Sequence, residues 1–293
     1  MMKFEGIMPA IITPLNDDQT VKVPVLHQLL EHLISEGADG FYVGGATGEG
    51  INLKTEERMI LAEEAVKAVG GRVPCIVQVA AYDFNDAVRL AKHAESIGAE
   101  AISATTPLFF PYSEDDIFNY YKALADSVSL PVMIYYNPAA GFPITANFAA
   151  RCHKVDNITG IKWTSPNYYE MIRLKDLTHG EMNIINGPDE MLLMGLSAGA
   201  DGGIGSTYNF QLKNIKRVYN LFKEGNMKAA LEAQTVADRI IYAMLSHGNI
   251  PPTRAILEAQ GFDVGNATFP ARRYTDEQKA KIIADMRAAG LEI

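Results

Sequence analysis

A lysine near the middle of the chain is the residue best suited to chemistry. Lys162 ends a short apolar run in the segment Thr159-Gly160-Ile161-Lys162-Trp163-Thr164. Burying an ammonium group is costly, which favours an uncharged amine for a lysine inside such a run. An uncharged amine can attack a ketone and form a Schiff base. A surface lysine at the end of a strand is the alternative, and the residues elsewhere in the chain have to decide between the two.

A glycine-rich segment is a candidate anion site. Gly44-Gly45-Ala46-Thr47-Gly48-Glu49 follows another apolar run. Its glycines leave backbone N–H groups free to face an anion, and Thr47 adds a hydroxyl. A carboxylate would fit there. A tight turn in which Thr47 is the N-cap of a helix explains the same residues equally well.

Two later segments carry further polar groups, Asn186–Glu190 and Gly202–Asn209. A glycine-rich loop late in a barrel is typical of phosphate binding, which would suggest a phosphorylated sugar or pyridoxal phosphate on Lys162. The adjacent carboxylates of Asp189 and Glu190 would repel a phosphate but would accept hydrogen bonds from a polyol. We therefore favour a sugar chain. Carboxylates that only stabilise a helix N-terminus are the alternative.

The elements that must position these residues follow a regular alternation. A short apolar run followed by an amphipathic segment recurs about every 25 to 30 residues, as in the βα units of a parallel barrel. The apolar runs are 7–13, 41–45, 75–80, 101–106, 132–136, 158–163, 183–186 and 201–205. The pattern predicts an α/β fold, a (β/α)8 TIM barrel over residues 1–224. Amphipathic segments at 227–246, 252–260 and 275–289 predict a C-terminal helical extension over residues 225–293.

Barrel enzymes carry their chemistry on the loops that follow the strands, and all the segments above lie there. The fifth run ends in Tyr135-Tyr136-Asn137-Pro138. One tyrosine of this pair should point into the barrel, where its hydroxyl needs a partner. Plain packing is the alternative.

Composition narrows the class of protein. The chain has 26 basic and 35 acidic residues and no basic run, which argues against nucleic acid or an anionic membrane surface as a partner. No apolar window is long enough to cross a bilayer, and the chain is expected to be cytoplasmic. Cys75 and Cys152 predict no disulfide framework, and the six histidines have no metal-ligand spacing. We therefore expect no metal site.

Five motifs together resemble the N-acetylneuraminate lyase and dihydrodipicolinate synthase superfamily of class I, pyruvate-dependent aldolases. They are Gly44–Glu49, Tyr136-Asn137, Gly160–Lys162, Gly187–Glu190 and Gly205–Asn209, and they span nearly the whole chain. The last two are similar to the lyase branch, which cleaves sialic acid to N-acetylmannosamine and pyruvate. The synthase branch is disfavoured, because it would carry an arginine in the stretch occupied here by Pro138–Phe142.

The resemblance implies a role for each residue. Lys162 would form the imine, so that no further cofactor is needed, and Tyr136 would transfer protons. Thr47, with the backbone of Ala46 and Thr47, would hold the carboxylate of the pyruvate half. The hydroxyl-rich remainder of the sugar acid would lie against Thr164, Gly187, Asp189, Glu190 and Ser206. The resemblance also implies a homotetramer.

Two departures from the family pattern keep the substrate open. Ala46 stands where sialic acid lyases commonly have a serine, and Leu108-Phe109-Phe110 stands where they have tyrosines that relay protons. Tyr112 is a possible replacement. An aldolase or dehydratase for another 2-keto-3-deoxy sugar acid is therefore the nearest alternative function. A sugar-acid binding protein without catalysis is a more distant one, because binding alone needs no Lys162.

Overall fold

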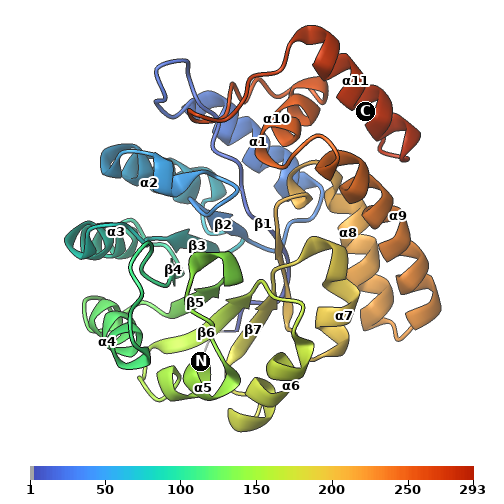
Figure 1. Ribbon diagram of the computed structural model, residues 1–293. Helices are drawn as coiled ribbons and strands as arrows, with labels where there is room; N and C mark the ends of the chain where they lie inside the picture. Colours follow the sequence, from blue (N-terminus) through green and yellow to red (C-terminus); the bar gives the residue numbers. More distant parts are fainter. Residues whose placement is uncertain (1–2) are drawn as a thin grey trace.

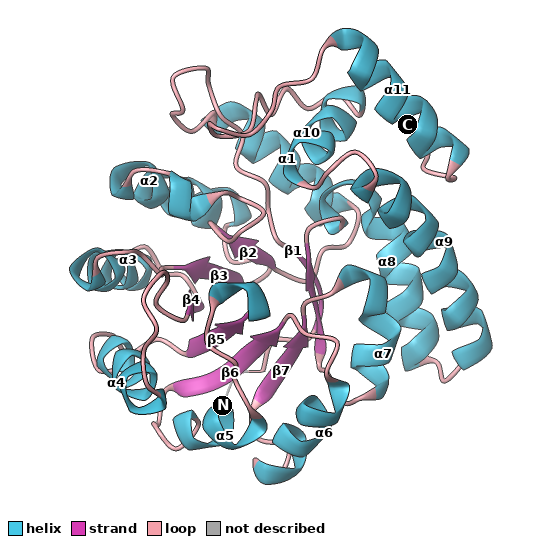
Figure 2. Cartoon of the chain, viewed as in Figure 1, coloured by secondary structure: helices cyan, strands magenta, loops and turns pink. Residues whose placement is uncertain are grey.

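The centre of the molecule is a ring of short parallel strands surrounded by helices (Figures 1 and 2). The computed structural model describes residues 3–293. Neighbouring strands follow the order β1-β8-β7-β6-β5-β4-β3-β2, and a parallel bridge between Ala10 and Tyr42 joins the two ends. The expected (β/α)8 barrel is confirmed. Its strands are β1 Gly6–Pro9, β2 Phe41–Val43, β3 Cys75–Gln78, β4 Ala101–Thr105, β5 Val132–Tyr136, β6 Ile158–Trp163, β7 Asn183–Asn186 and β8 Gly202–Gly205.

Helices cover the outside of the barrel, one after each strand (Figure 2). They are α1 Val23–Ser35, α2 Thr55–Val69, α3 Phe84–Ser96, α4 Glu114–Ala125, α5 Ala146–Cys152, α6 Tyr168–Leu177, α7 Leu192–Ser197 and α8 Tyr208–Lys223. Glycines at 37, 98 and 199 lie between helices and the next strands with φ of +91°, +82° and +97°. This left-handed conformation, which glycine adopts without strain, lets the chain turn from a helix into the following strand.

The first strand is shorter than expected. β1 ends at Pro9, although its apolar run continues to Thr13. Beyond Pro9 the backbone N–H of Ala10 donates to Gly205 O at 2.9 Å, and that of Ile11 donates to Tyr42 O at 3.0 Å. The chain thus crosses from one neighbouring strand to the other at this point. The crossing closes the barrel and ends the regular ladder.

Side chains from the strands divide into two layers. One cluster comes almost entirely from strands, including Met8, Tyr42, Met133 and Ile204, and fills the barrel interior. The alternate strand residues join helix residues in two further clusters between barrel and helices. This alternation follows from the two-residue period of a strand, and it decides which side chains can reach the barrel mouth.

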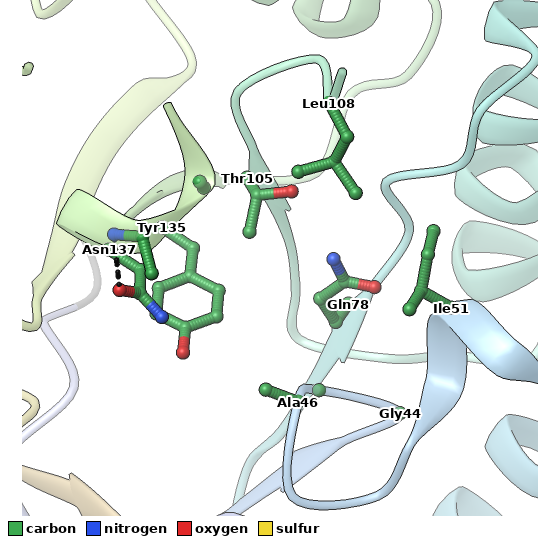
Figure 3. Close-up of a pocket in the computed structure, with 11 residues that line it drawn as sticks. Gly44, Ala46, Ile51, Gln78, Thr105, Leu108, Tyr135 and Asn137 are labelled. Atoms are coloured by element: carbon green, nitrogen blue, oxygen red, sulfur yellow. Dashed lines mark hydrogen bonds between the residues drawn. The ribbon is translucent and has the colours of Figure 1, made fainter. Parts of the chain in front are cut away.

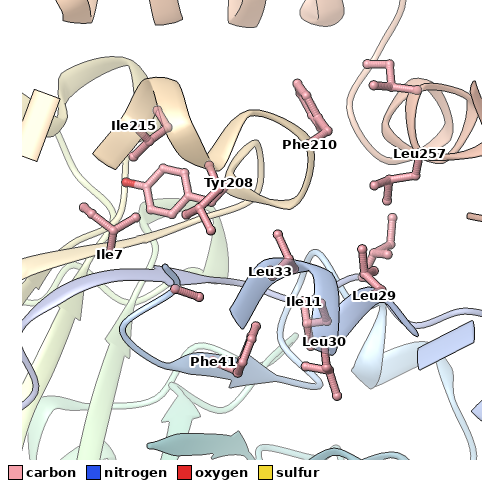
Figure 4. Packing of buried hydrophobic residues seen from close by; sticks show 14 of the residues in the cluster. Ile7, Ile11, Leu29, Leu30, Leu33, Phe41, Tyr208, Phe210, Ile215 and Leu257 are labelled. Carbon is pink, nitrogen blue, oxygen red and sulfur yellow. The ribbon is translucent and has the colours of Figure 1, made fainter. Parts of the chain in front are cut away.

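A helical extension follows the barrel, as expected. It consists of α9 Met227–Leu245, α10 Ile250–Ala259 and α11 Asp276–Ala288, and α9 packs along α8 (Figure 1). Leu257 of α10 belongs to the same hydrophobic cluster as Phe210 of α8 and Leu29 of α1 (Figure 4). Extension and barrel therefore share a core. No helix among the described residues is both long and apolar enough to cross a membrane.

Candidate active site

Lys162 lies near the carboxyl end of β6 and is only 5% exposed. Its Nζ is 4.4 Å from the centroid of the Tyr135 ring and 4.5 Å from that of the Tyr42 ring. Within residues 3–293 no carboxylate forms a salt bridge with it. The amine is therefore held between two aromatic rings inside the barrel, which agrees with the expectation that it is no surface lysine.

Of the adjacent pair Tyr135 and Tyr136, it is Tyr135 that lies beside this lysine, and not Tyr136 as the family resemblance suggested. Tyr135 pairs with Lys162 in the sheet, and both point into the barrel. Tyr136 pairs with Trp163 and packs edge-on against its ring, with 4.9 Å between the centroids, in the layer between barrel and helices. Its hydroxyl pairs with the Ser165 side chain, and burial raises its pKa. Adjacent residues of a strand face opposite ways, so the two tyrosines cannot both face the amine.

The glycine-rich loop after β2 is folded tightly on itself. Gly44 has a φ of +69°, and a Cβ at Gly50 would lie 1.9 Å from Gly44 O. The hydroxyl of Thr13 donates to Gly48 O at 2.6 Å. Ala46 is exposed at the barrel mouth, whereas Thr47 is 7% exposed. Both residues that were expected to hold a carboxylate therefore belong to a rigid loop.

The end of this loop is anchored by an ion pair that the sequence analysis missed. Glu49 adopts a φ of +54°, and Arg254 Nη2 of α10 donates to Glu49 Oε1 at 2.6 Å. The Thr268 backbone N–H and hydroxyl donate to the other oxygen at 2.7 and 2.6 Å. Glu49 and Arg254 are 7% and 3% exposed. Burial lowers the pKa of Arg254, and the nearby Glu49 opposes that shift. The extension thus fixes the shape of the loop.

A cavity of about 210 Å³ opens beside Tyr135, on the side of β2 to β5 (Figure 3). Its lining is mainly apolar, with polar groups from Gln78, Thr105 and Asn137. The sequence analysis had singled out none of these three residues as ligand contacts. The lining consists of Gly44, Gly45, Ala46, Ile51, Gln78, Thr105, Leu108, Tyr135, Asn137, Ala139 and Ala140.

The expected sugar-binding residues gather on the other side of the barrel mouth, after β6, β7 and β8. A Cβ at Gly187 would lie 2.0 Å from Thr164 Oγ1, so these two residues are in contact. The Thr164 hydroxyl is buried and has no hydrogen-bond partner in the described chain. Ser206 Oγ lies 3.4 Å from Asp189 Oδ2. Four of the five residues therefore form two contacting pairs, and the partners of each pair are 17 or 23 residues apart in the sequence.

Asp189 and Glu190 differ in their surroundings. Asp189 is 5% exposed, and its Oδ2 accepts from the Thr207 backbone N–H and hydroxyl, both at 2.7 Å. Burial raises its pKa to about 6, partly opposed by these hydrogen bonds. Glu190 is exposed. The Asp189 carboxylate is thus largely used to hold the loop after β8, while that of Glu190 is free to meet a ligand.

The aromatic residues after β4 point away from the cavity. Phe109 and Phe110 are 87% and 63% exposed, and Tyr112 is 42% exposed. Their rings contact one another edge-on, and Leu108 is the residue of this segment that lines the cavity. No side-chain hydroxyl from this stretch reaches the cavity of the single chain.

Comparisons with known proteins agree with this architecture. The profile of the Dihydrodipicolinate synthetase family matches residues 3–289. The chain belongs to this family. It is 32% identical to the N-acetylneuraminate lyase of Rhizobium meliloti (strain 1021) over 283 residues, 96% of this chain and 94% of that protein. The resemblance inferred from the five motifs is therefore confirmed.

Solved structures from both branches of the family have the same fold. The N-acetylneuraminate lyase of Proteus mirabilis is 33% identical with a TM-score of 0.94, covering 99% of this chain and 100% of that one. A dihydrodipicolinate synthase from Bacillus anthracis is 25% identical with a TM-score of 0.93, covering 98% and 99%. Because both share the barrel almost completely, the fold does not separate the two activities. The side chains at the barrel mouth must do so.

Proposed function

We propose that the chain is a class I aldolase that cleaves N-acetylneuraminate to N-acetylmannosamine and pyruvate through an imine on Lys162. The observation that carries the proposal is the buried Lys162 amine beside Tyr135, with the glycine-rich loop after β2 and the polar groups of Asp189 and Ser206 at the same end of the barrel. The similarity to two N-acetylneuraminate lyases supports this substrate.

The chemistry needs an electron sink. The Lys162 amine attacks the C2 ketone, water leaves, and a protonated imine results. Loss of the C4 hydroxyl proton breaks the C3–C4 bond, and the bonding electrons move into the iminium to give an enamine. C4 leaves as the aldehyde of the amino sugar. Protonation of the enamine at C3 and hydrolysis then release pyruvate and the free amine.

Tyr135 is the group best situated to move these protons. Two tyrosine rings contact Lys162, but Tyr135 lines the cavity, whereas the Tyr42 hydroxyl donates to Ser103 Oγ at 3.0 Å. We therefore transfer to Tyr135 the role first assigned to Tyr136. A positioned acid or base of this kind contributes about 10²- to 10⁴-fold to a rate. The Thr47 hydroxyl and the backbone N–H groups of Ala46 and Thr47 would donate hydrogen bonds to the carboxylate of the substrate.

The remaining residues would bind the sugar chain. The exposed Glu190 carboxylate can accept hydrogen bonds from hydroxyl groups of the substrate. The Thr164 hydroxyl is unpaired but buried against Gly187, so it would border the sugar site without facing the solvent. Gly187 keeps space open beside Thr164, since a side chain there would collide with its hydroxyl. Asp189 and Ser206 would shape the loop between β7 and β8 around the end of the chain.

One observation favours a second substrate class. Ala46 and Leu108 line the cavity where family members have hydroxyls, so the proton path of a sialic acid lyase is incomplete in a single chain. An aldolase or dehydratase for another 2-keto-3-deoxy sugar acid would fit this cavity too. Dihydrodipicolinate synthesis fits less well, because Ala139 and Ala140 occupy the wall where an arginine would bind a second carboxylate.

The test of the proposal is to trap the imine. Borohydride added with pyruvate should inactivate the protein and add a pyruvate-derived mass to Lys162. Lys162→Ala should abolish the added mass, while Lys122→Ala, a substitution on the surface of α4, should not. Pyruvate release should then be measured with N-acetylneuraminate and with several 2-keto-3-deoxy sugar acids. Modification of another lysine, or none at all, would refute the aldolase mechanism.

We also propose that the chain forms a homotetramer, as the family resemblance implies. Phe109, Phe110 and Tyr112 form an exposed aromatic cluster. This cluster supports a subunit interface, because monomeric proteins rarely expose several aromatic side chains in one patch. Phe109 also has a φ of +81°, a strained conformation for a residue with a side chain. Light scattering should give four copies, and Phe109→Ser combined with Phe110→Ser should reduce that number. A monomeric wild-type protein would disprove the assembly.

A further inference from the structure

An oriented hydrogen-bond donor faces the cavity from β3. Gln78, the last residue of that strand, is 6% exposed and lines the cavity beside Ala46. Arg58 Nη2 donates to Gln78 Oε1 at 2.8 Å. A guanidinium can only donate, so the amide oxygen must face Arg58 and the amide nitrogen must face away. Figure 3 shows this nitrogen directed toward Thr105 and Leu108, on the cavity side.

Arg58 is itself firmly placed. It comes from α2, is 5% exposed, and donates to the backbone oxygens of Ala80 and Gln78 at 2.8 and 2.9 Å. Three hydrogen bonds from one guanidinium thus fix both the end of β3 and the Gln78 side chain. The orientation of the amide is therefore a property of the folded barrel and not of a mobile side chain.

The charge of Arg58 lacks a paired carboxylate. Within residues 3–293 no acidic group forms a salt bridge with it. Burial lowers its pKa to about 10, and Tyr120, Tyr42 and Asp86 oppose this shift only in part. A buried cation without a counter-ion favours an anion nearby. Its hydrogen bond to Gln78 Oε1 also polarises the amide, which strengthens the Nε2–H donor on the cavity side.

This donor compensates for what the neighbouring loop lacks. Ala46 offers the cavity only a methyl group, and Ile51 and Leu108 are apolar. Gln78 Nε2 donates to no other residue of the described chain, and it is not sealed off from the cavity. A carboxylate accepts about four hydrogen bonds, more than Thr47 and the loop backbone supply alone. The adjacent strand thus provides a donor to the cavity that the Ala46 side chain does not.

We propose that Gln78, oriented by Arg58, donates a hydrogen bond to the carboxylate of the bound 2-oxo acid and makes the site select anionic over neutral ketones. The inference rests on the proposed imine at Lys162 and adds to it a residue that determines specificity. Gln78 acts by touching the substrate, whereas Arg58 acts through Gln78 and is a positioning residue.

The experiment compares two ketones that differ in charge. Pyruvate carries a carboxylate, and hydroxyacetone has a hydroxymethyl group in its place. The concentration of each ketone that gives half-maximal trapping of Lys162 by borohydride is measured by intact mass. Gln78→Leu should raise this concentration about ten- to a hundred-fold for pyruvate, the usual effect of losing a hydrogen bond to a charged group. For hydroxyacetone it should change by about twofold or less, since the missing donor has no anionic partner.

A second variant guards against a loss of folding. Gln78→Glu keeps the shape of the side chain and gives Arg58 a carboxylate partner, so the barrel should stay folded. It replaces the donor by an anion and should weaken pyruvate trapping more than Gln78→Leu does. Gln260→Leu, which removes an amide that bonds Phe210 O outside the cavity, is the matched control and should leave both ketones unaffected.

The outcomes separate this inference from the proposed function. If wild-type Lys162 traps neither ketone, the imine mechanism fails and the inference with it. If the wild-type protein traps pyruvate and both Gln78 variants equal it, only the inference is overturned. Equal losses for pyruvate and hydroxyacetone would likewise overturn it, because a general change of cavity shape would then explain the effect.

Discussion

Tyr135→Phe and Tyr136→Phe form a matched pair of substitutions. Each removes one hydroxyl from adjacent residues of β5, whose rings lie on opposite faces of the barrel wall. The Tyr135 ring is 4.4 Å from Lys162 Nζ, whereas the Tyr136 ring packs against Trp163. The pair therefore tests the assignment of the proton-transfer group while the chemistry of the substitution stays constant.

The expected effects differ in size and in kind. Removal of a positioned acid or base costs about 10²- to 10⁴-fold in turnover, or about 3 to 5 kcal/mol of the activation barrier. We expect this loss for Tyr135→Phe, with the folded state little changed. Tyr136→Phe removes a hydroxyl that pairs with Ser165 and should cost about 1 kcal/mol of the free energy of unfolding. Its turnover should stay within about threefold of wild type.

Three measurements on each variant separate the roles. They are the rate of pyruvate release from the sugar acid, the trapping of Lys162 with pyruvate, and the free energy of unfolding in urea. A proton-transfer group acts in the transition state, so Tyr135→Phe should lower turnover far more than the affinity for pyruvate. A larger loss of turnover in Tyr136→Phe would refute the reasoning. Equal losses of turnover and affinity in Tyr135→Phe would reduce that residue to a packing role.

Other predictions concern the two loops. Burial raises the pKa of Asp189 to about 6 from an ordinary 3.8, so its carboxylate is lost as the pH falls through 6. Sugar-acid turnover should therefore fall on the acid side of pH 6, and Asp189→Asn should remove that part of the pH profile while pyruvate trapping stays nearly intact. Glu49→Gln leaves the buried Arg254 without its counter-charge and should cost about 3 to 5 kcal/mol of unfolding free energy in urea, part of which the added Arg254→Met should restore. Ala46→Ser, which adds a hydroxyl to the cavity lining, should raise turnover on sialic acid about tenfold if a relay hydroxyl is missing. A flat response would favour another sugar acid as substrate.

The features that depend on local sequence were predictable. β5, β6 and β7 begin and end at the residues expected from their apolar runs. The start of α8 illustrates the limit of such patterns. The amphipathic pattern predicts this helix over residues 212–223. The helix begins at Tyr208, but Gln211 departs from helical geometry with φ and ψ of −136° and 35°. The regular part therefore starts where the amphipathic period starts.

The direction in which each strand side chain points was harder to predict from the sequence. Strands of a parallel barrel are buried on both faces, so an apolar run gives no alternation to read. In β5 the interior residue Tyr135 and the outer residue Tyr136 are the same amino acid. The register between β5 and β6 also shifts between Val132 and Met133, which defeats counting from the strand start. Which of the two tyrosines faces the amine is evident only once the pairing of Tyr135 with Lys162 is known.

Contacts between distant segments left no pattern in the sequence. Arg254 follows Glu49 by 205 residues, and nothing in either neighbourhood marks the pair. Arg58 lies on an amphipathic helix where a basic residue is usually solvated, and Gln78 ends a strand of apolar residues. A glutamine within such a run was the single available signal. Its meaning depends on the guanidinium that holds its oxygen.

The barrel mouth is divided into two halves by Lys162, and the C-terminal extension supports both. Arg254 of α10 holds the loop after β2, which is the proposed anion side. Gln234 of α9 donates to Asp189 O at 3.1 Å and accepts from the Leu193 backbone N–H at 3.0 Å, on the proposed sugar side. In the proposed reaction the bond that breaks lies between the two halves of the substrate. Substitutions on the proposed sugar side can therefore alter which aldehyde is released, while Lys162 and the proposed anion side keep the same imine chemistry.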